Sequence, residues 1–493
     1  MSIYPSSFIL YSSPLNSERK VLKNSFAGLI ALGAGSFLNL LTVSLLARYL
    51  GTAGFGQYSY IMAFVGAFQL CSEMGLSTVL VRDITLDKKN VNKYMGEALP
   101  LLWTLALGTL ALIFLSARIL HPDPELLTSL YIAGIATVVT TQPNIYIAVF
   151  RAFESMEINA IAFILQKVFF LALIYLIAIR GQQQLPGVFL ALLGANLLVW
   201  FFYYLIAIQK YGRPKPRINV KYCVSLLKEA IPVGFGEISR KIIWQVDILI
   251  LGIIDLPVSI ALYSSAYKLL GALNLIPQVF AIPLYPYLSQ LAENSPEALA
   301  RAYEKSLKFM WILSLPIAIG TVVLSDRIIF AFFGPEYSGA AAALKILIWA
   351  TMFLFLSSNY KYLFTILRKQ HLYTYLVVLS LTVNTLLDLI LIPLLSYKGA
   401  CFATLITEVI LYLVGYYFLR KSGVVVPLIP NAAKPLLGGV IAGMILYSVR
   451  DVSYGLLGLI GFMDFGFYFL LLFLFRTFSQ KEIEGLVRLV KKS

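Results

Sequence analysis

Residues 25–47 read SFAGLIALGAGSFLNLLTVSLLA, a run of 23 residues that contains no charged side chain. A membrane-spanning helix needs about 20 mostly apolar residues at about 1.5 Å of rise each, so this run is long enough to cross a bilayer. Transmembrane strands are shorter, about 10 residues, and they alternate apolar with polar side chains, which this run does not do. The stretch therefore predicts a helix that spans a membrane.

Thirteen further runs of this kind follow along the chain. Of its 493 residues, 59% are hydrophobic and 13% are charged, whereas roughly a quarter of the residues are charged in soluble proteins. The other predicted spans are 57–80, 98–117, 126–150, 158–179, 186–208, 229–254, 258–290, 308–330, 340–364, 371–395, 398–419, 434–450 and 454–475. This composition excludes a water-soluble enzyme and predicts an all-α polytopic membrane protein of about 14 transmembrane helices.

The distribution of basic residues predicts how these helices are oriented. Of the 39 lysines and arginines, 28 lie in or beside the N-terminal tail, the loops after even-numbered spans and the C-terminal tail, against 6 at the other loops. Because basic residues collect on the cytoplasmic side, both termini are predicted to be cytoplasmic in a multi-pass protein of the cell membrane. The net charge of +15 is thus mainly a topology signal, and nucleic-acid binding is not expected.

A basic loop and a weak internal repeat divide the chain. Tyr58-Ser59 and Tyr263-Ser264 each follow a long span and a short outer loop, which suggests a duplicated half, and the basic loop lies midway between them. Duplicated halves are a common way to build transporters, with the substrate near the midplane. The predicted organisation is a cytoplasmic N-tail 1–24, an N-lobe 25–208, a basic cytoplasmic linker 209–228, a C-lobe 229–419, two further spans within 420–475, and a basic amphipathic cytoplasmic tail 476–493.

Several stretches resemble one family of membrane proteins. They are VLKNSFAGLIALGAGSFLNLLTVSLLARYLGTAGFGQYSYIMAF (21–64), SEMGLSTVLVRDIT (72–85), KEAIPVGFGEISRKIIWQVDILILGII (228–254), FFGPEYSGAAAALKIL (332–347) and LIPLLSYKGACFATLITE (391–408). Their order and spacing resemble the polysaccharide biosynthesis membrane proteins, the Wzx-type O-antigen flippases that carry lipid-linked oligosaccharides. The resemblance covers roughly residues 20–420.

The resemblance implies a fold similar to the multidrug and toxic compound extrusion (MATE) transporters, with two pseudo-symmetric six-helix lobes around a central cavity and two added C-terminal helices. It implies a flippase that moves a polyprenyl-pyrophosphate-linked oligosaccharide across the cytoplasmic membrane by alternating access, for surface polysaccharide biosynthesis. The expected partners are this lipid-linked oligosaccharide, membrane lipids and other glycan-assembly membrane proteins. A MATE-type cation-coupled multidrug antiporter is the alternative.

Basic residues inside the predicted spans are the candidate substrate site. A charge at the centre of a bilayer costs at least about 2.5–3.5 kcal/mol on insertion scales, so such residues usually face a wet cavity or a partner. Arg240, Lys241, Lys268 and Lys167 are expected to line a cavity that binds the pyrophosphate and its sugar. Lys345 lies close to an outer end and is expected to extend toward the interface instead. Ion pairs within the membrane are the competing interpretation.

Acidic residues in the spans are candidates for ion coupling. Asp247, Glu237 and Glu73 could carry a proton or bind Na⁺, although structural pairing would also explain them. Asp388, Glu408 and Asp464 are further candidates, and for Asp388, which lies near the outer end of its span, a solvated side chain is the alternative. Members of the family often carry Asp-x-Gly where this chain has Ser72-Glu73-Met74-Gly75, which makes the role of Glu73 less certain.

Motifs for other chemistry are absent from the sequence. There is no GxxxxGK[ST] phosphate loop, so ATP is not expected to drive the protein directly. The two histidines, His121 and His371, are isolated from each other, and no metal site is expected. With no room for a soluble catalytic domain, the protein is predicted not to be an enzyme and to have no cofactor beyond a possible H⁺ or Na⁺ coupling ion.

Overall fold

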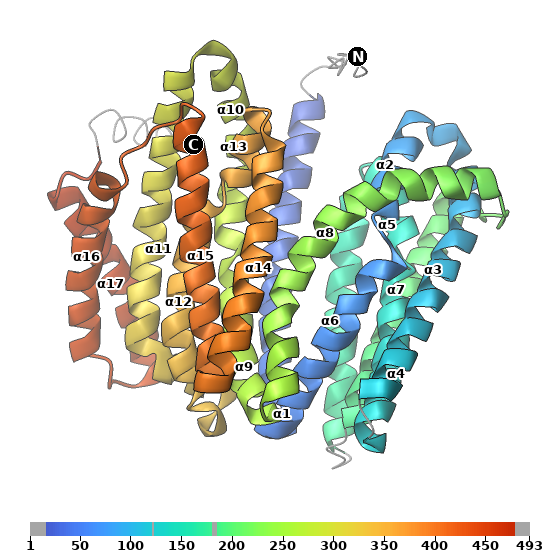
Figure 1. The fold of residues 1–493 in the computed structure, drawn as a ribbon, viewed down its shortest axis with the longest axis horizontal. Helices are drawn as coiled ribbons and strands as arrows, with labels where there is room; N and C mark the ends of the chain where they lie inside the picture. Colours follow the sequence, from blue (N-terminus) through green and yellow to red (C-terminus); the bar gives the residue numbers. More distant parts are fainter. Residues whose placement is uncertain (1–15, 121–122, 180–184, 479–493) are drawn as a thin grey trace.

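The computed structural model describes residues 16–120, 123–179 and 185–478. Within these ranges, the side chains of 16–32, 34, 70, 232–233, 235–244, 282–283, 293–294, 296 and 429 are not described. The described residues form helices and no strands (Figure 1). The basic amphipathic tail predicted for 476–493 falls almost wholly outside these ranges.

The first half of the chain forms a bundle on one side of the molecule (Figure 1). Long runs of Leu, Ile and Ala carry each helix, and the breaks fall at Gly, Pro and short polar stretches. The helices are α1 (Asn16–Gln69), α2 (Leu76–Leu86), α3 (Val91–Leu120), α4 (Pro124–Thr141), α5 (Asn144–Ala152), α6 (Met156–Ile179) and α7 (Leu185–Tyr211), with 3₁₀ turns at Leu70–Ser72 and Lys88–Asn90. We call these helices the N-lobe.

The second half forms the other bundle, and the last two helices pack against its outside on α11. The helices are α8 (Val220–Ile254), α9 (Pro257–Leu273), α10 (Leu275–Asn294), α11 (Pro296–Phe333), α12 (Ala340–Ser357), α13 (Tyr360–Ile366), α14 (Gln370–Leu395), α15 (Tyr397–Lys421), α16 (Ile429–Ser448) and α17 (Tyr454–Leu474), with a 3₁₀ turn at Pro335–Tyr337. We call α8 to α15 the C-lobe.

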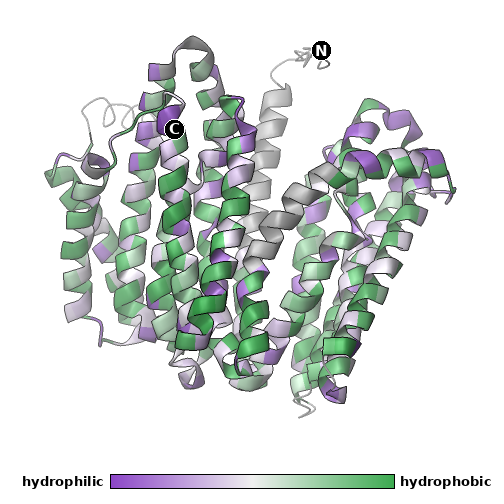
Figure 2. Cartoon of the chain, viewed as in Figure 1, coloured by the Kyte–Doolittle hydropathy of each residue, from purple (hydrophilic) through white to green (hydrophobic). Residues whose placement is uncertain are grey.

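The chain is built to cross a membrane many times. In the described residues, nine helical segments are long and apolar enough to span a bilayer, or ten if the bent pair α9–α10 is one span. Figure 2 shows hydrophobic residues along the helices and hydrophilic residues gathered at their two ends. This pattern confirms the predicted all-helical membrane fold. A total of 14 spans is consistent with it, because α1 and α8 include stretches whose side chains are not described.

Helix α1 contains the predicted first span and the start of the second. Gly51 interrupts it with φ 66° and ψ −178°, a conformation that favours glycine because it has no Cβ. The helix therefore reverses at the loop that hydropathy places between 47 and 57. A second break, at Met74 (φ 47°) and Gly75 (φ 80°), separates α1 from α2.

The two lobes repeat one local structure, in the fourth and the tenth predicted spans. Both spans are central, with 67% of the apolar window buried in each. Each breaks near its end, into α4–α5 and into α12–α13.

Each of these spans also closes with the same turn. A residue at φ 56°, Glu154 or Arg368, ends it. The next amide then bonds back to a carbonyl of the helix, Ser155 to Phe150 at 2.8 Å and Lys369 to Phe364 at 2.7 Å. This matched pair supports the duplicated halves that the sequence suggests.

The lobes meet along α1, α8 and α9. The two bundles lie close together at the end where α9 begins and spread apart toward the end where the described chain begins (Figure 1). A Cβ on Gly56 of α1 would lie 1.7 Å from the carbonyl oxygen of Pro257 of α9, so the backbones touch there. Helix α8 starts beside α2 of the N-lobe and ends against α14 of the C-lobe, and it is therefore the continuous link between the lobes.

An ion pair connects α2 to the first part of α8. Arg82 of α2 contacts Glu229 of α8 and its neighbour Asp83, each at 2.7 Å. The hydrogen bonds to Asp83 and Glu229 raise the pKa of the Arg82 guanidinium above its ordinary value. Because these side chains are about half exposed, the pair contributes little to the free energy of unfolding.

Helix α11 begins well before the ninth predicted span. Ser295 caps its start, accepting a hydrogen bond from the amide of Ala298 at 3.0 Å. From Pro296 the helix continues without a break into the ninth span. Continuous backbone hydrogen bonding favours one long helix where no Gly or Pro separates the two parts.

Candidate functional site

A polar cavity of about 430 Å³ lies where the N-lobe meets α8 and α9. Among the described residues that line it, the charged ones are Lys167 of α6 and Lys268 of α9, and none is a carboxylate. Each lysine lies about 16 Å along its helix, which is near the middle of an apolar core about 30 Å thick. We call this cavity the lysine cavity.

Neutral groups hold both lysines. The Lys167 ammonium donates to Asn39 Oδ1 at 2.8 Å and lies 5.5 Å from the ring centre of Phe163. The Lys268 ammonium donates to Ser59 Oγ at 3.4 Å. It also lies 4.8 Å and 5.2 Å from the ring centres of Phe55 and Tyr58. Such contacts stabilise an ammonium without neutralising it, so the positive charge remains available to an anion.

A network of amides forms another wall of the lysine cavity. Gln166, the neighbour of Lys167, donates to Asn196 Oδ1 at 2.6 Å. Asn196 in turn donates to Thr140 Oγ1 at 2.6 Å and to the carbonyl of Ala136 at 3.0 Å. Because both groups are neutral, the network fixes the wall of the cavity without adding a charge. Sequence reasoning missed it, although uncharged amides inside apolar spans are a visible signal.

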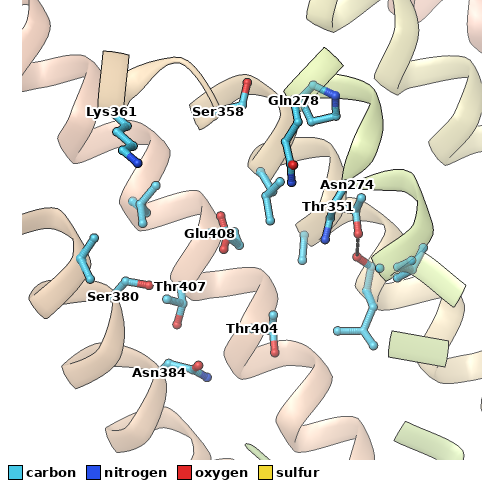
Figure 3. A pocket seen from close by; sticks show the side chains of 18 of the residues that line it. Asn274, Gln278, Thr351, Ser358, Lys361, Ser380, Asn384, Thr404, Thr407 and Glu408 are labelled. Atoms are coloured by element: carbon cyan, nitrogen blue, oxygen red, sulfur yellow. Dashed lines mark hydrogen bonds between the residues drawn. The ribbon is translucent and has the colours of Figure 1, made fainter. Parts of the chain in front are cut away.

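A second polar cavity, of about 450 Å³, lies inside the C-lobe between α8, α9, α10, α12, α14 and α15. Tyr267 lines this C-lobe cavity and the lysine cavity as well, so the two cavities are neighbours. Figure 3 shows polar side chains from several helices converging on the C-lobe cavity. They are mostly amides and hydroxyls: Asn274, Gln278, Thr351, Ser358, Ser380, Asn384, Thr404 and Thr407.

Asp247, which lines the C-lobe cavity, meets a second carboxyl group, that of Asp388. Asp247 of α8 is 3% exposed and Asp388 of α14 is fully buried, and their side chains contact each other. Tyr263 and Thr404 donate to Asp247 Oδ2, the latter at 3.1 Å, and Asn384 donates to Asp388 Oδ2 at 3.3 Å. The Oδ1 atom of each carboxyl group is buried and has no hydrogen-bond partner in the described residues.

The burial of Asp388 decides between its two interpretations. Its side chain is not solvated at the end of the span, because the helix face that carries it packs against α8. Ser380, Asn384 and Asp388 are spaced by four residues and therefore share one face of α14. This polar stripe in an apolar span is the signal that would have shown the residue facing inward.

The remaining predicted site residues either have side chains that the structure does not describe or line neither of the two cavities. The side chains of Arg240, Lys241 and Glu237 lie outside the described part of the structure. Glu73 accepts a hydrogen bond from Asn144 of α5 and lines neither of the two cavities. Lys345 forms an ion pair with Asp326 at 2.9 Å near the surface, where its side chain is 42% exposed. In the described residues, no cluster of three or more His, Cys, Asp or Glu side chains forms a metal site.

The chain thus forms two lobes of membrane-spanning helices, with one polar cavity at their junction and a second inside the C-lobe, and solved structures share this fold. Lipid II flippase MurJ in its inward closed conformation has a TM-score of 0.73 at 17% identity, over 89% of this chain and 97% of that chain. An inward-facing multidrug resistance MATE family transporter has a TM-score of 0.65 at 13% identity, over 79% and 94%. The predicted MATE-like fold is confirmed.

The chain belongs to the polysaccharide biosynthesis protein family, whose pattern matches residues 21–292. A similar curated protein is the probable low-salt glycan biosynthesis flippase Agl15 of Haloferax volcanii. It is 22% identical over 384 residues, which cover 75% of this chain and 77% of that protein. These similarities confirm the family that the sequence motifs predicted.

Proposed function

We propose that the protein is a flippase that moves a polyprenyl-pyrophosphate-linked oligosaccharide across the cytoplasmic membrane for surface polysaccharide biosynthesis. The observation that supports this function best is the lysine cavity, where two ammonium groups lie at mid-membrane depth and no carboxylate is found among the described lining residues. A pyrophosphate carries several negative charges, and it would replace the weak neutral partners of both lysines.

Transport would proceed by alternating access. The lobes touch at the predicted outer end, where Gly56 meets Pro257, and they spread at the predicted cytoplasmic end (Figure 1). This arrangement suits loading from the inner leaflet, with the headgroup between the lobes and the polyprenyl chain in the lipid. Both termini would lie in the cytoplasm, and other glycan-assembly proteins of the same membrane would supply the substrate.

The contact between Asp247 and Asp388 suggests how transport is driven. Two carboxylates in contact repel each other strongly when both are charged and buried. A proton or a Na⁺ ion would remove this repulsion, and the two unpartnered Oδ1 atoms are free to hold it. We propose that movement of this ion is coupled to the rocking of the lobes, through α8 and α14.

The alternative function, a cation-coupled multidrug antiporter, shares the fold of the MATE transporter. An antiporter for amphipathic cations would not place two uncompensated ammonium groups in its central cavity. The lysine cavity therefore favours the flippase. Efflux of cationic dyes from cells that produce the protein, in a host without its own efflux pumps, would support the antiporter instead.

Charge removal in the lysine cavity tests the proposal. Lys167→Ala and Lys268→Ala should together abolish surface glycan export in cells that lack the native protein, because the pyrophosphate loses both cations. Lys345→Ala is the matched control, since this lysine is paired with Asp326 outside the cavity, and export should persist. Undiminished export by the double variant, at equal protein levels, would refute the lysine site.

A further inference from the structure

The charges of the two cavities are opposite in sign. Among the side chains that the structure describes, Lys167 and Lys268 line the lysine cavity and no acid does. In the same described part, the C-lobe cavity is lined by Asp247 and Glu408, and its one basic residue is Lys361. Lys361 lies on the short helix α13 and is exposed, so that solvent screens much of its charge. A substrate that reaches from one cavity to the other therefore passes from a positive to a negative environment.

The carboxyl group of Glu408 is available to accept hydrogen bonds from a ligand in the C-lobe cavity. Asp247 already accepts hydrogen bonds from Tyr263 and Thr404. In contrast, the Glu408 carboxyl has no hydrogen-bond or ion-pair partner in the described residues, although it lies within the apolar span formed by α15. Figure 3 shows its side chain projecting from α15 into the cavity, between the residues of α14 and those of α10.

The rest of the lining suits a sugar. Asn274 and Gln278 of α10 and Thr407 of α15 offer amide and hydroxyl groups that can donate and accept. Asn274 Oδ1 is buried and has no partner in the described residues. Tyr362 and Tyr373 add aromatic surface. A few polar groups that converge within an otherwise apolar wall are typical of sites that orient a small polar ligand.

We propose that the C-lobe cavity is the glycan subsite of the flippase, and that Glu408 makes it select uncharged sugars over acidic sugars next to the pyrophosphate. This inference rests on the proposed function, because it assumes that the pyrophosphate occupies the lysine cavity. Tyr267, which lines both cavities, would lie beside the bond between the pyrophosphate and the first sugar.

The selectivity has a simple physical basis. The Glu408 carboxylate accepts hydrogen bonds from sugar hydroxyls, and each such bond to a charged group is stronger than a neutral one. An acidic sugar would bring a second carboxylate against Glu408, which lies within the apolar span formed by α15. This like-charge contact rejects the acidic sugar, in the same way that repulsive elements set specificity at other sites.

Competition between two matched lipids tests the proposal. Both are polyprenyl-pyrophosphate disaccharides that begin with N-acetylglucosamine, and the second sugar is either glucose or glucuronic acid, which differ only at C6. Native mass spectrometry of the full-length protein in detergent reports how much of each lipid is bound. The wild type should prefer the glucose lipid by about ten-fold or more. Glu408→Gln should bring the ratio close to one, chiefly by admitting the glucuronic acid lipid.

A matched control and a second variant separate the outcomes. Glu336→Gln makes the same change at an exposed glutamate outside both cavities, and the wild-type preference should remain. Equal binding of both lipids by the wild type, or an unchanged preference in Glu408→Gln, would overturn the glycan subsite while leaving the flippase intact. If the wild type binds neither lipid, or if Lys167→Ala with Lys268→Ala binds both normally, the proposed function itself fails.

Discussion

Lys268 is held by one hydroxyl and two aromatic rings, and this set of partners leaves its charge free for a ligand. A buried ammonium with a carboxylate partner would be a structural ion pair, and that was the competing interpretation from the sequence. Asp247, the acid expected to pair with it, accepts hydrogen bonds from Tyr263 and Thr404 instead. The separation of these two charges into neighbouring cavities is what makes one cavity suitable for an anion.

Substitutions of Lys268 should lower export to different degrees, depending on whether the new side chain is charged. Lys268→Arg should keep most export, because the guanidinium also binds phosphate and also stacks on aromatic rings. Lys268→Met should lower export at least ten-fold, since it keeps the length and loses the charge. Export is measured as surface glycan per cell at matched protein level. Similar export by the methionine and arginine variants would show that the charge is not needed.

The carboxyl pair predicts a change in energy coupling. Asp388→Asn removes one of the two charges and leaves hydrogen-bonding groups of the same shape. Substrate should still bind, but a pH or Na⁺ gradient across proteoliposomes should no longer accelerate its movement. Glu336→Gln serves as the control, because Glu336 is exposed and lines neither cavity, and it should respond to the gradient. A gradient effect of normal size in Asp388→Asn would exclude the pair as the coupling site.

At the scale of helices, the apolar runs of the sequence predict where the spans lie, but they do not predict where the helices within a span break. The runs at 158–179, 186–208 and 454–475 match α6, α7 and α17 closely, since burial in lipid depends on average hydropathy. The breaks at Pro143 and Asn274 are not visible in such an average. They depend on tertiary contacts, which resatisfy the backbone groups that a break exposes.

The candidate site, too, could be predicted from the sequence only in part. Depth along a span can be counted from the sequence, and this is how Lys167, Lys268 and Asp247 become candidates. The direction in which a side chain points depends on which neighbour its helix packs against. For Asp388, the polar stripe that it shares with Ser380 and Asn384 indicates an inward-facing side chain, but nothing in one span alone shows that this face packs against α8.

The crossing of α1 and α9 offers a prediction at the scale of elements. Gly56→Val would place side-chain atoms where the Pro257 carbonyl lies, so the lobes should no longer close at the predicted outer end. In a variant without native cysteines, Met62→Cys in the lysine cavity should then react several-fold faster with a membrane-impermeant maleimide added from outside.

The control for this experiment is Gly108→Val, because a Cβ at Gly108 of α3 meets no atom within 4 Å. Its labelling should match that of the parent protein. Both proteins should elute as single species in detergent, which excludes misfolding as the cause. If Gly56→Val leaves the labelling rate unchanged, the contact with Pro257 does not close the outer end.

At the scale of the whole molecule, the N-lobe and the C-lobe, linked through α8, bring a positive cavity and a negative cavity next to each other. The repeated turns at Glu154 and Arg368 show that the lobes share a common plan, yet their polar residues differ. The N-lobe side supplies lysines, and the C-lobe supplies carboxylates, amides and hydroxyls. A lipid-linked glycan has this same division between an anionic pyrophosphate and an uncharged sugar.

The most direct test of the central claim is the movement of a polyprenyl-pyrophosphate disaccharide across proteoliposomes that contain only this protein. Periodate, which does not cross the bilayer, destroys sugars exposed on the outer leaflet, so the fraction destroyed reports translocation over time. We predict that protein-containing liposomes expose nearly all of the sugar and protein-free liposomes about half. We also predict that the Lys167→Ala and Lys268→Ala double variant behaves like protein-free liposomes. Exposure of only half the sugar by the wild-type protein, in the presence of a proton or Na⁺ gradient, would contradict the account.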